Sequence, residues 1–227
     1  MKKYQKLVTL GCSLAPKWDS WPEYTAKHLD IGQDDWTHYG FGGSGNQLLL
    51  ALWHEYFLNN DLSDTLVIWE ITGLNRHSGI FKLGSEEKKA IRMDKEWDGD
   101  NTGWWHKINT FYDNKERYGL FNNFRDFEPF NQYNIDAQTL YAQLTSTLCT
   151  IPCDTLIFRG WSGAVYEPKW QKSIPVFEKY NKTVITEPYV DWVIEHDLPM
   201  QEDGVHPRPA GAQGYFENIM KLYLDKM

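Results

Sequence analysis

The sequence is poor in cysteine, contains no long hydrophobic run and has no excess of positive charge. Three cysteines in 227 residues are an odd number and too few for a disulfide framework. No stretch approaches the roughly 18 apolar residues that a transmembrane helix needs. The formal net charge of −8 argues against a general nucleic-acid-binding protein, which needs a basic surface to neutralise phosphates. We therefore expect neither a membrane nor a nucleic acid as a partner.

The N-terminal residues "MKKYQKLVTL" begin like a signal peptide, but their apolar run is shorter than such a signal needs. The apolar run lasts about five residues before polar Gly-Cys-Ser, whereas a secretory signal needs roughly 7–15. We expect a buried first strand here and a cytoplasmic protein. Cys149 and Cys153 have a C-x-x-x-C spacing, but no second Cys/His pair completes a zinc site, so we predict two packed thiols and no metal or cofactor.

Aromatic residues are abundant, at 15% of the chain with eleven tryptophans. Some tryptophans lie in polar, glycine-containing stretches such as "EWDGDNTGWWHK". Two interpretations remain open. The tryptophans could belong to a tryptophan-rich core with a folded-back loop, or Trp104, Trp105 and Trp161 could form a platform for a flat or sugar-like ligand.

Apolar segments alternate with amphipathic ones along most of the chain. We predict strands near 6–10, 34–41, 64–72, 154–161 and 182–186, and helices near 18–29, 44–58, 135–148, 168–180 and 212–226. Asp19 or Ser20 is the expected N-cap of the first helix. This alternation predicts a parallel, three-layer α/β/α sandwich. The chain 1–227 is expected to form one domain, and the polar, aromatic segment 73–132 is expected to be an insertion after the third strand that forms a lid or a substrate-binding region.

In such a sheet, ligands bind beyond the carboxyl ends of the strands. The first strand ends in "GCSLA", the second in "GFGGSGN" and the third in "ITGLNR", while the last long loop contains "DGVHP". Ser13 is a candidate nucleophile, because a serine hydroxyl becomes reactive beside a histidine base whose tautomer a carboxylate fixes. His206 and Asp203 could supply that base and carboxylate.

The glycines at 40, 42 and 45 also spell the G-x-G-x-x-G pattern of dinucleotide-binding loops. That fingerprint follows the first strand and is followed about 20 residues later by an acidic residue at the end of the second strand. Here the glycines follow the second predicted strand instead. The position favours a loop that turns a backbone amide towards a reacting carbonyl over a loop that binds a dinucleotide.

In their order and spacing these blocks resemble those of the SGNH (GDSL-like) hydrolases. The resemblance implies a flavodoxin-like α/β/α fold and hydrolysis of carboxylic esters through an acyl-enzyme intermediate. It also implies a triad of Ser13, Asp203 and His206, and an oxyanion hole formed by the amides of Ser13 and Gly43 and by the side chain of Asn75.

Several residues depart from the family pattern. Cys12 and Ala15 replace an aspartate and a serine of the first block, His38 stands where the glycine block often begins with asparagine, and Arg76 replaces the aspartate after Asn75. Thr72 or Asn46 could therefore donate to the oxyanion instead of Asn75. The departures also keep open an alternative function, a catalytically decayed binding or structural module on the same fold.

The prediction is therefore a serine esterase that needs no metal or cofactor and acts on a small-molecule or carbohydrate ester. The tryptophans suggest an O-acylated carbohydrate as the substrate. The oligomeric state stays open.

Overall fold

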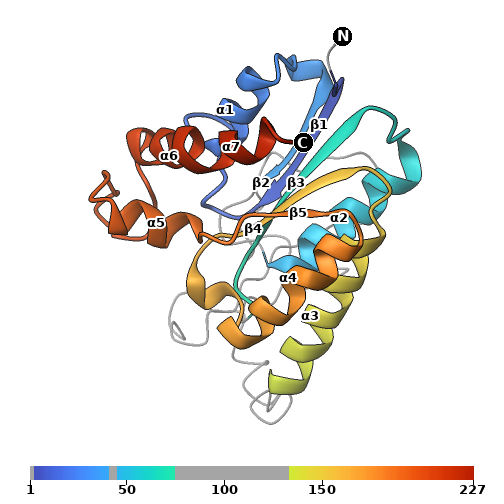
Figure 1. The fold of residues 1–227 in the computed structure, drawn as a ribbon. Coiled ribbons are helices and arrows are strands. Elements are labelled where there is room, and N and C mark those ends of the chain that lie inside the picture. The colour runs from blue at the N-terminus through green and yellow to red at the C-terminus, as the bar shows by residue number, and fades with distance from the viewer. Residues whose placement is uncertain (1–2, 41–44, 75–132) are drawn as a thin grey trace, which may run out of the picture.

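Five parallel strands form the centre of the protein. The computed structural model describes residues 3–40, 45–74 and 133–227 (Figure 1). The strands are β1 (Lys6–Gly11), β2 (Trp36–Gly40), β3 (Thr65–Ile71), β4 (Asp154–Arg159) and β5 (Thr183–Val184), in the spatial order β2-β1-β3-β4-β5. This is the strand order of flavodoxin-like sheets. The predicted fold class is confirmed.

Helices cover both faces of this sheet (Figure 1). One face is covered by α1 (Trp21–His28), α5 (Tyr189–Glu195), α6 (Pro209–Tyr215) and α7 (Lys221–Leu224), with the π-helical turn η6 (Phe216–Met220) between the last two. The other face is covered by α2 (Asn46–Asn59), α3 (Tyr133–Thr150) and α4 (Glu167–Lys179). Two short 3₁₀ turns, η1 (Gln33–Asp35) and η5 (Ser162–Ala164), complete the described elements.

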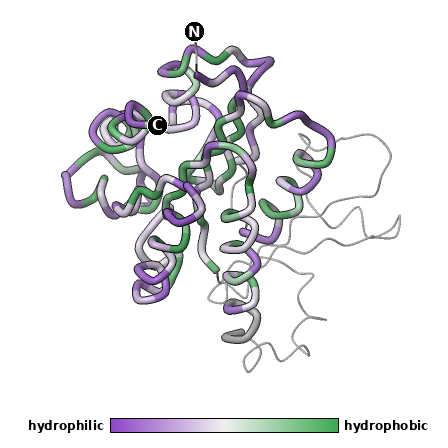
Figure 2. Tube along the Cα trace, turned by 45° about the vertical axis from the view of Figure 1, so that its right-hand side comes forward, coloured by the Kyte–Doolittle hydropathy of each residue, from purple (hydrophilic) through white to green (hydrophobic). Residues whose placement is uncertain are grey.

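The central strand β3 explains why two cores form. All seven of its residues are buried, and successive side chains point to opposite faces of the sheet. Leu66 and Ile68 join the core beneath α1 and α6, whereas Val67 and Trp69 join the core beneath α2 and α3. Figure 2 shows the hydrophobic residues concentrated in these central strands. A strand buried on both faces is mostly apolar, which is why the sequence of β3 shows no alternation; Thr65 and Glu70 are its polar residues.

Much of the tryptophan content lies in these two cores. The buried tryptophans are Trp21, Trp36, Trp53, Trp69, Trp170 and Trp192. The interpretation of a tryptophan-rich core therefore holds for this part of the chain.

The predicted elements differ from the structure mainly at their ends. Ser20 occupies the N-cap position of α1, but its hydroxyl donates to the carbonyl of Leu14 instead of capping the helix. The fifth strand has only two residues, and α4 continues through Pro175. The short helix α5, to which the sequence analysis assigned no element, buries four apolar or aromatic residues within seven positions.

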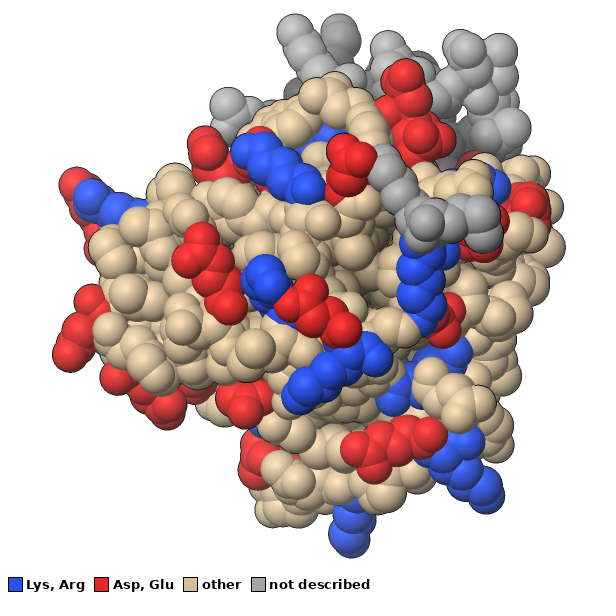
Figure 3. Space-filling view, turned by 45° about the horizontal axis from the view of Figure 1, so that its top comes forward, with Lys and Arg blue, Asp and Glu red and all other residues tan. Residues whose placement is uncertain are grey.

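The described surface carries charges of both signs. On the face shown in Figure 3, basic and acidic side chains are interspersed. None of the described helices combines the length and the apolarity that a membrane span requires.

Candidate active site

Three described loops that the sequence analysis singled out leave the same edge of the sheet. Ser13 follows β1, Gly73 follows β3 and Trp161 follows β4. Because all the strands are parallel, their carboxyl ends lie together at this edge. Residues from distant parts of the chain therefore meet here.

Ser13 and His206 are in hydrogen-bond contact. The Oγ of Ser13 lies 2.8 Å from Nε2 of His206, although 193 positions separate the two residues in the chain. Both residues are partly buried. A serine hydroxyl at this distance from an imidazole nitrogen can pass its proton to that nitrogen.

Asp203 lies on the other side of the imidazole. Its Oδ2 is 2.5 Å from Nδ1 of His206. The backbone N–H groups of His206 and Val205 donate to its Oδ1 at 3.0 and 2.9 Å. These two amides, together with the imidazole, lower the pKa of Asp203 to about 2. The carboxylate thus stays charged and assigns the Nδ1 proton to His206, which leaves Nε2 free to accept from Ser13.

A short hairpin presents both Asp203 and His206. Met200 and Pro207 form an antiparallel bridge, and the amide of Gln201 donates to the carbonyl of His206 at 2.7 Å. The turn closes at Gly204, whose φ of +66° is a conformation that glycine adopts without strain. Asp203 does not cap the helix that follows it, since Arg208 is the N-cap of α6.

The turn that carries Ser13 packs directly against two glycines, Gly11 and Gly160. The amide of Ala15 donates to the carbonyl of Cys12 at 3.0 Å, which closes the turn. A Cβ on Gly11 would come within 2.6 Å of the Ala15 Cβ, and a Cβ on Gly160 would come within 3.1 Å of a Leu14 methyl group. Glycine at these positions of β1 and after β4 lets the nucleophile turn, residues 12–15, lie directly on the sheet.

A buried carboxyl group lies below this turn, and the sequence analysis gave it no role. Glu70 of β3 has no exposed surface, and the thiol of Cys12 donates to its Oε1 at 3.2 Å. A Cβ on Gly11 or on Gly160 would approach the Glu70 carboxyl oxygens to 2.5 or 2.6 Å, so both glycines make room for it. The signal in the sequence was the single acidic residue among the mostly apolar residues 65–71.

Part of the predicted oxyanion hole and platform lies outside the described residues. This holds for Gly43, Asn75, Trp104 and Trp105. The amide of Ser13 has no hydrogen-bond partner among the described residues, so it is available as a donor. Trp161 is partly buried and packs against the core beneath α1.

The two alternative donors differ in their availability. The side chain of Asn46 is buried and bound to the backbone of Thr72, with its Nδ2 donating to the Thr72 carbonyl at 2.8 Å and its Oδ1 accepting from the Thr72 amide at 3.1 Å. Asn46 therefore connects α2 to the end of β3. The buried hydroxyl of Thr72 has no partner within the described part of the chain and stays a possible donor.

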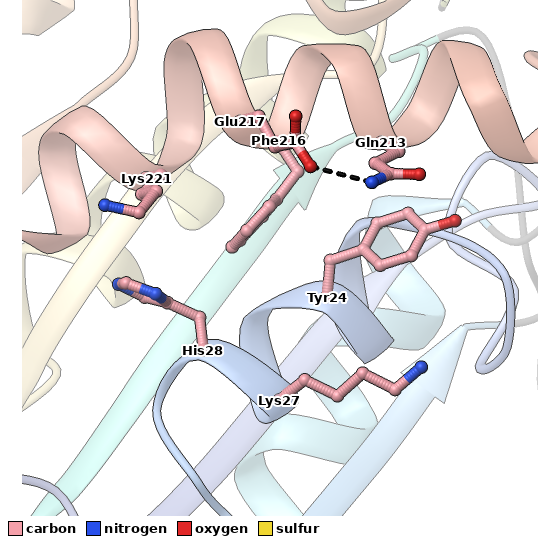
Figure 4. A pocket seen from close by; sticks show the side chains of 7 residues that line it. All are labelled: Tyr24, Lys27, His28, Gln213, Phe216, Glu217 and Lys221. Carbon is pink, nitrogen blue, oxygen red and sulfur yellow. Dashed lines mark hydrogen bonds between the residues drawn. The ribbon is translucent and has the colours of Figure 1, made fainter.

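The described surface has two hollows, one away from Ser13, Asp203 and His206 and one that borders Asp203. A hollow of about 580 Å³ lies between α1 and the helical segment from α6 to α7 (Figure 4). The basic side chains that line it already have partners, because Lys27 pairs with Glu23 while His28 and Lys221 both contact Asp225.

A second hollow, of about 350 Å³, borders Asp203. It is lined by Gln201, Glu202, Asp203 and Arg208. Among the described residues, no group of three or more His, Cys, Asp or Glu side chains is placed to hold a metal ion.

No family model and no curated protein matches the chain. Solved structures that are similar to it include a psychrotrophic esterase from Pseudoalteromonas sp., with 16% identity, a TM-score of 0.46 and coverage of 98% of this chain and 97% of that one. A GDSL-like lipase from Bacteroides thetaiotaomicron has 14% identity, a TM-score of 0.46 and coverage of 100% and 90%. An acetylxylan esterase from Geobacillus stearothermophilus has 12% identity, a TM-score of 0.47 and coverage of 96% and 95%.

This likeness concerns the fold alone, and the function proposed below rests on side-chain geometry. The strand order by itself identifies the flavodoxin-like α/β/α fold that the resemblance to the SGNH (GDSL-like) hydrolases implies.

Proposed function

We propose that the protein is a serine hydrolase that cleaves carboxylic esters through an acyl-enzyme intermediate. The observation that carries this proposal is the continuous contact from Ser13 Oγ to His206 Nε2 at 2.8 Å and from His206 Nδ1 to Asp203 at 2.5 Å. A buried structural serine has no need of such a chain, whereas a nucleophile does.

The geometry supports the following sequence of proton transfers. Ser13 Oγ attacks the ester carbonyl carbon while its proton passes to Nε2 of His206. The negative charge that forms on the carbonyl oxygen is stabilised by the Ser13 amide, with Gly43 and Asn75 as the further proposed donors. His206 then returns the proton to the departing alcohol oxygen. Water attacks the acyl-enzyme in the same way and releases the acid and the free serine.

The experiment compares ester hydrolysis by the wild type, Ser13→Ala and Ser63→Ala. Ser63 is an exposed serine in the turn before β3, at the opposite end of the strands, and serves as the matched control. With a nitrophenyl acetate substrate, we expect Ser13→Ala to lose at least about a thousandfold in kcat/KM and Ser63→Ala to keep the wild-type value. A fluorophosphonate probe should label the wild type at Ser13.

Equal rates for the wild type and Ser13→Ala, with no labelling of Ser13, would contradict the proposal. That outcome would instead favour the alternative of a decayed binding module on this fold.

We also propose that the alcohol part of the substrate is a carbohydrate. Trp161 supports this, because its partly buried indole lies just after β4, at the same edge of the sheet as Ser13, and indole faces stack on sugar rings. Acetylated sugars should be hydrolysed faster than acetate esters of simple aliphatic alcohols. Equal rates for the two kinds of acetate would exclude the carbohydrate proposal while leaving the serine mechanism intact.

A further inference from the structure

A partly buried histidine, with a buried Nε2 atom, lies beside the nucleophile turn and outside the proposed triad. His38 belongs to β2, and its side chain lies next to Thr9 of the neighbouring strand β1, with which it is in register. In the sequence, His38 stands where the glycine block of the SGNH pattern often begins with asparagine. Both ring nitrogens of His38 have polar neighbours, and these neighbours indicate how the ring is oriented and what it contacts.

On one side, the ring is held by a hydroxyl. Thr9 Oγ1 lies 2.8 Å from Nδ1 of His38, and Thr9 is completely buried. The same Oγ1 accepts the indole N–H of Trp36 at 2.9 Å. With one lone pair of Thr9 occupied in this way, its own hydrogen is available to His38 Nδ1.

On the other side, the ring faces backbone carbonyl groups. Nε2 of His38 lies near the carbonyls of Ala15 and Gly40, although neither contact has the geometry of a full hydrogen bond. A Cβ on Gly40 would overlap with both the Ala15 carbonyl oxygen and His38 Nε2, so only glycine lets the two approach each other there. Carbonyl oxygens accept and cannot donate, so we assign the ring proton to Nε2 and let Nδ1 accept from Thr9.

The environment keeps this imidazole neutral. Burial and the positive charge of Lys17 lower the pKa of His38 to about 4. Lys17 is the charged group that acts on His38 within the described residues, and its Nζ lies 5.1 Å from the ring centre of Trp36 and 5.3 Å from that of Trp18. At neutral pH, His38 therefore presents a single N–H to the nucleophile turn.

We infer that His38 is a positioning residue for the nucleophile. Its Nε2–H faces the carbonyl of Ala15, two residues after Ser13, and attracts that oxygen electrostatically, which connects the nucleophile turn to β2. This contact adds to the Ala15–Cys12 hydrogen bond that closes the turn and limits the displacement of Ser13 Oγ from His206. This inference rests on the proposed hydrolase function and deepens it.

The experiment compares His38→Leu, which lacks a donor, with His38→Gln, whose amide can still donate to the Ala15 carbonyl. With an activated acetyl ester we expect His38→Leu to lower kcat about 10- to 100-fold while KM changes less than about threefold, since a nucleophile misplaced by about 1 Å can cost about 100-fold. His38→Gln should keep at least about a third of the wild-type kcat. The matched control is His54→Gln, an exposed histidine of α2, which should behave as the wild type.

A second pair of variants tests the same contact if His38→Leu does not fold. Thr9→Val removes the hydroxyl that orients the ring and should lower kcat, whereas Thr9→Ser keeps the hydroxyl and should not. Independently of activity, NMR of the imidazole nitrogens should find His38 neutral at pH 6 with its proton on Nε2.

Three results would overturn the inference. They are a folded His38→Leu variant with wild-type kcat, a His38→Gln variant as slow as His38→Leu, or an NMR spectrum that places the proton on Nδ1. Failure of the proposed function has a different signature, because the wild type and Ser13→Ala would then react equally whatever residue occupies position 38.

Discussion

At the scale of single residues, the hairpin closed by the Met200–Pro207 bridge orients two of the three proposed catalytic side chains. Asp203 accepts from the amides of Val205 and His206 and also contacts the imidazole of His206. The spacing D-x-x-H is what permits this, because a carboxylate reaches the amides two and three residues later in a tight turn. Contacts within the hairpin therefore orient Asp203 and His206 relative to each other.

The charge of Asp203 gives the first prediction at this scale. Its pKa of about 2 means that the carboxylate stays ionised at all pH values above about 3, so its protonation should not limit activity there. Asp203→Asn should lower kcat by roughly 10³- to 10⁴-fold, because the amide no longer fixes the Nδ1 proton or stabilises the imidazolium. Steady-state kinetics on a nitrophenyl ester measures this, with Glu202→Gln in the same turn as the control. A loss below about tenfold would remove Asp203 from the mechanism.

At the scale of elements, the loops of the site depend on contacts between neighbouring strands and helices. Asn46 opens α2, and its side chain satisfies both the carbonyl and the amide of Thr72 just after β3. This contact fixes the end of β3, beyond which the third loop begins. The asparagine of the second block is thus a structural connector.

The loss of this connector should be costly. Asn46→Ala leaves a buried amide and a buried carbonyl of Thr72 without partners, each worth about 1–3 kcal/mol, so we expect a destabilisation of about 2–6 kcal/mol. Urea denaturation would measure it. Asn59→Ala at the other end of α2 is the control, since its exposed side chain only reaches the carbonyl of Glu55 and its removal should cost less than about 1 kcal/mol. Equal stability of the two variants would refute this role for Asn46.

At the scale of the whole molecule, stability depends on groups that folding keeps uncharged. His38 is such a group, since its pKa falls from 6.5 to about 4 in the folded protein. Between these two pH values the unfolded chain binds more protons than the folded one, so the free energy of unfolding decreases as the pH falls. The carboxyl groups with lowered pKa, such as Glu23 and Glu167, lose their contribution only at lower pH, below about 4.5.

The acid sensitivity of the fold should therefore begin above the range in which carboxylates titrate. We expect the free energy of unfolding to fall by about 1–3 kcal/mol from pH 7 to pH 4.5 through His38, and this part of the decrease should be absent in His38→Gln. Urea unfolding at the two pH values tests the expectation, with His54→Gln as the variant that should retain the wild-type decrease. If His38→Gln lost as much stability as the wild type, His38 would not be the group responsible.

The sequence by itself determined the layers and the chemistry available at one edge of the sheet. Apolar segments such as 64–72 have to be buried on both faces of a sheet. Strands that alternate with helices form right-handed crossover connections, so the parallel sandwich follows from local patterns. Periodicity did not predict the short helix α5, and it predicted a longer fifth strand than the two residues of β5. The formation of both elements depends on packing more than on periodicity.

Only the tertiary structure decided which polar residues meet. The contact between Ser13 and His206 joins positions 193 residues apart, and no local pattern encodes such a distance. The same is true of Glu70 below Cys12, of Asn46 on Thr72, and of His38 between Thr9 and Ala15. Each of these contacts exists because strand order and register bring side chains from separate segments to one edge, where burial leaves each of them few partners.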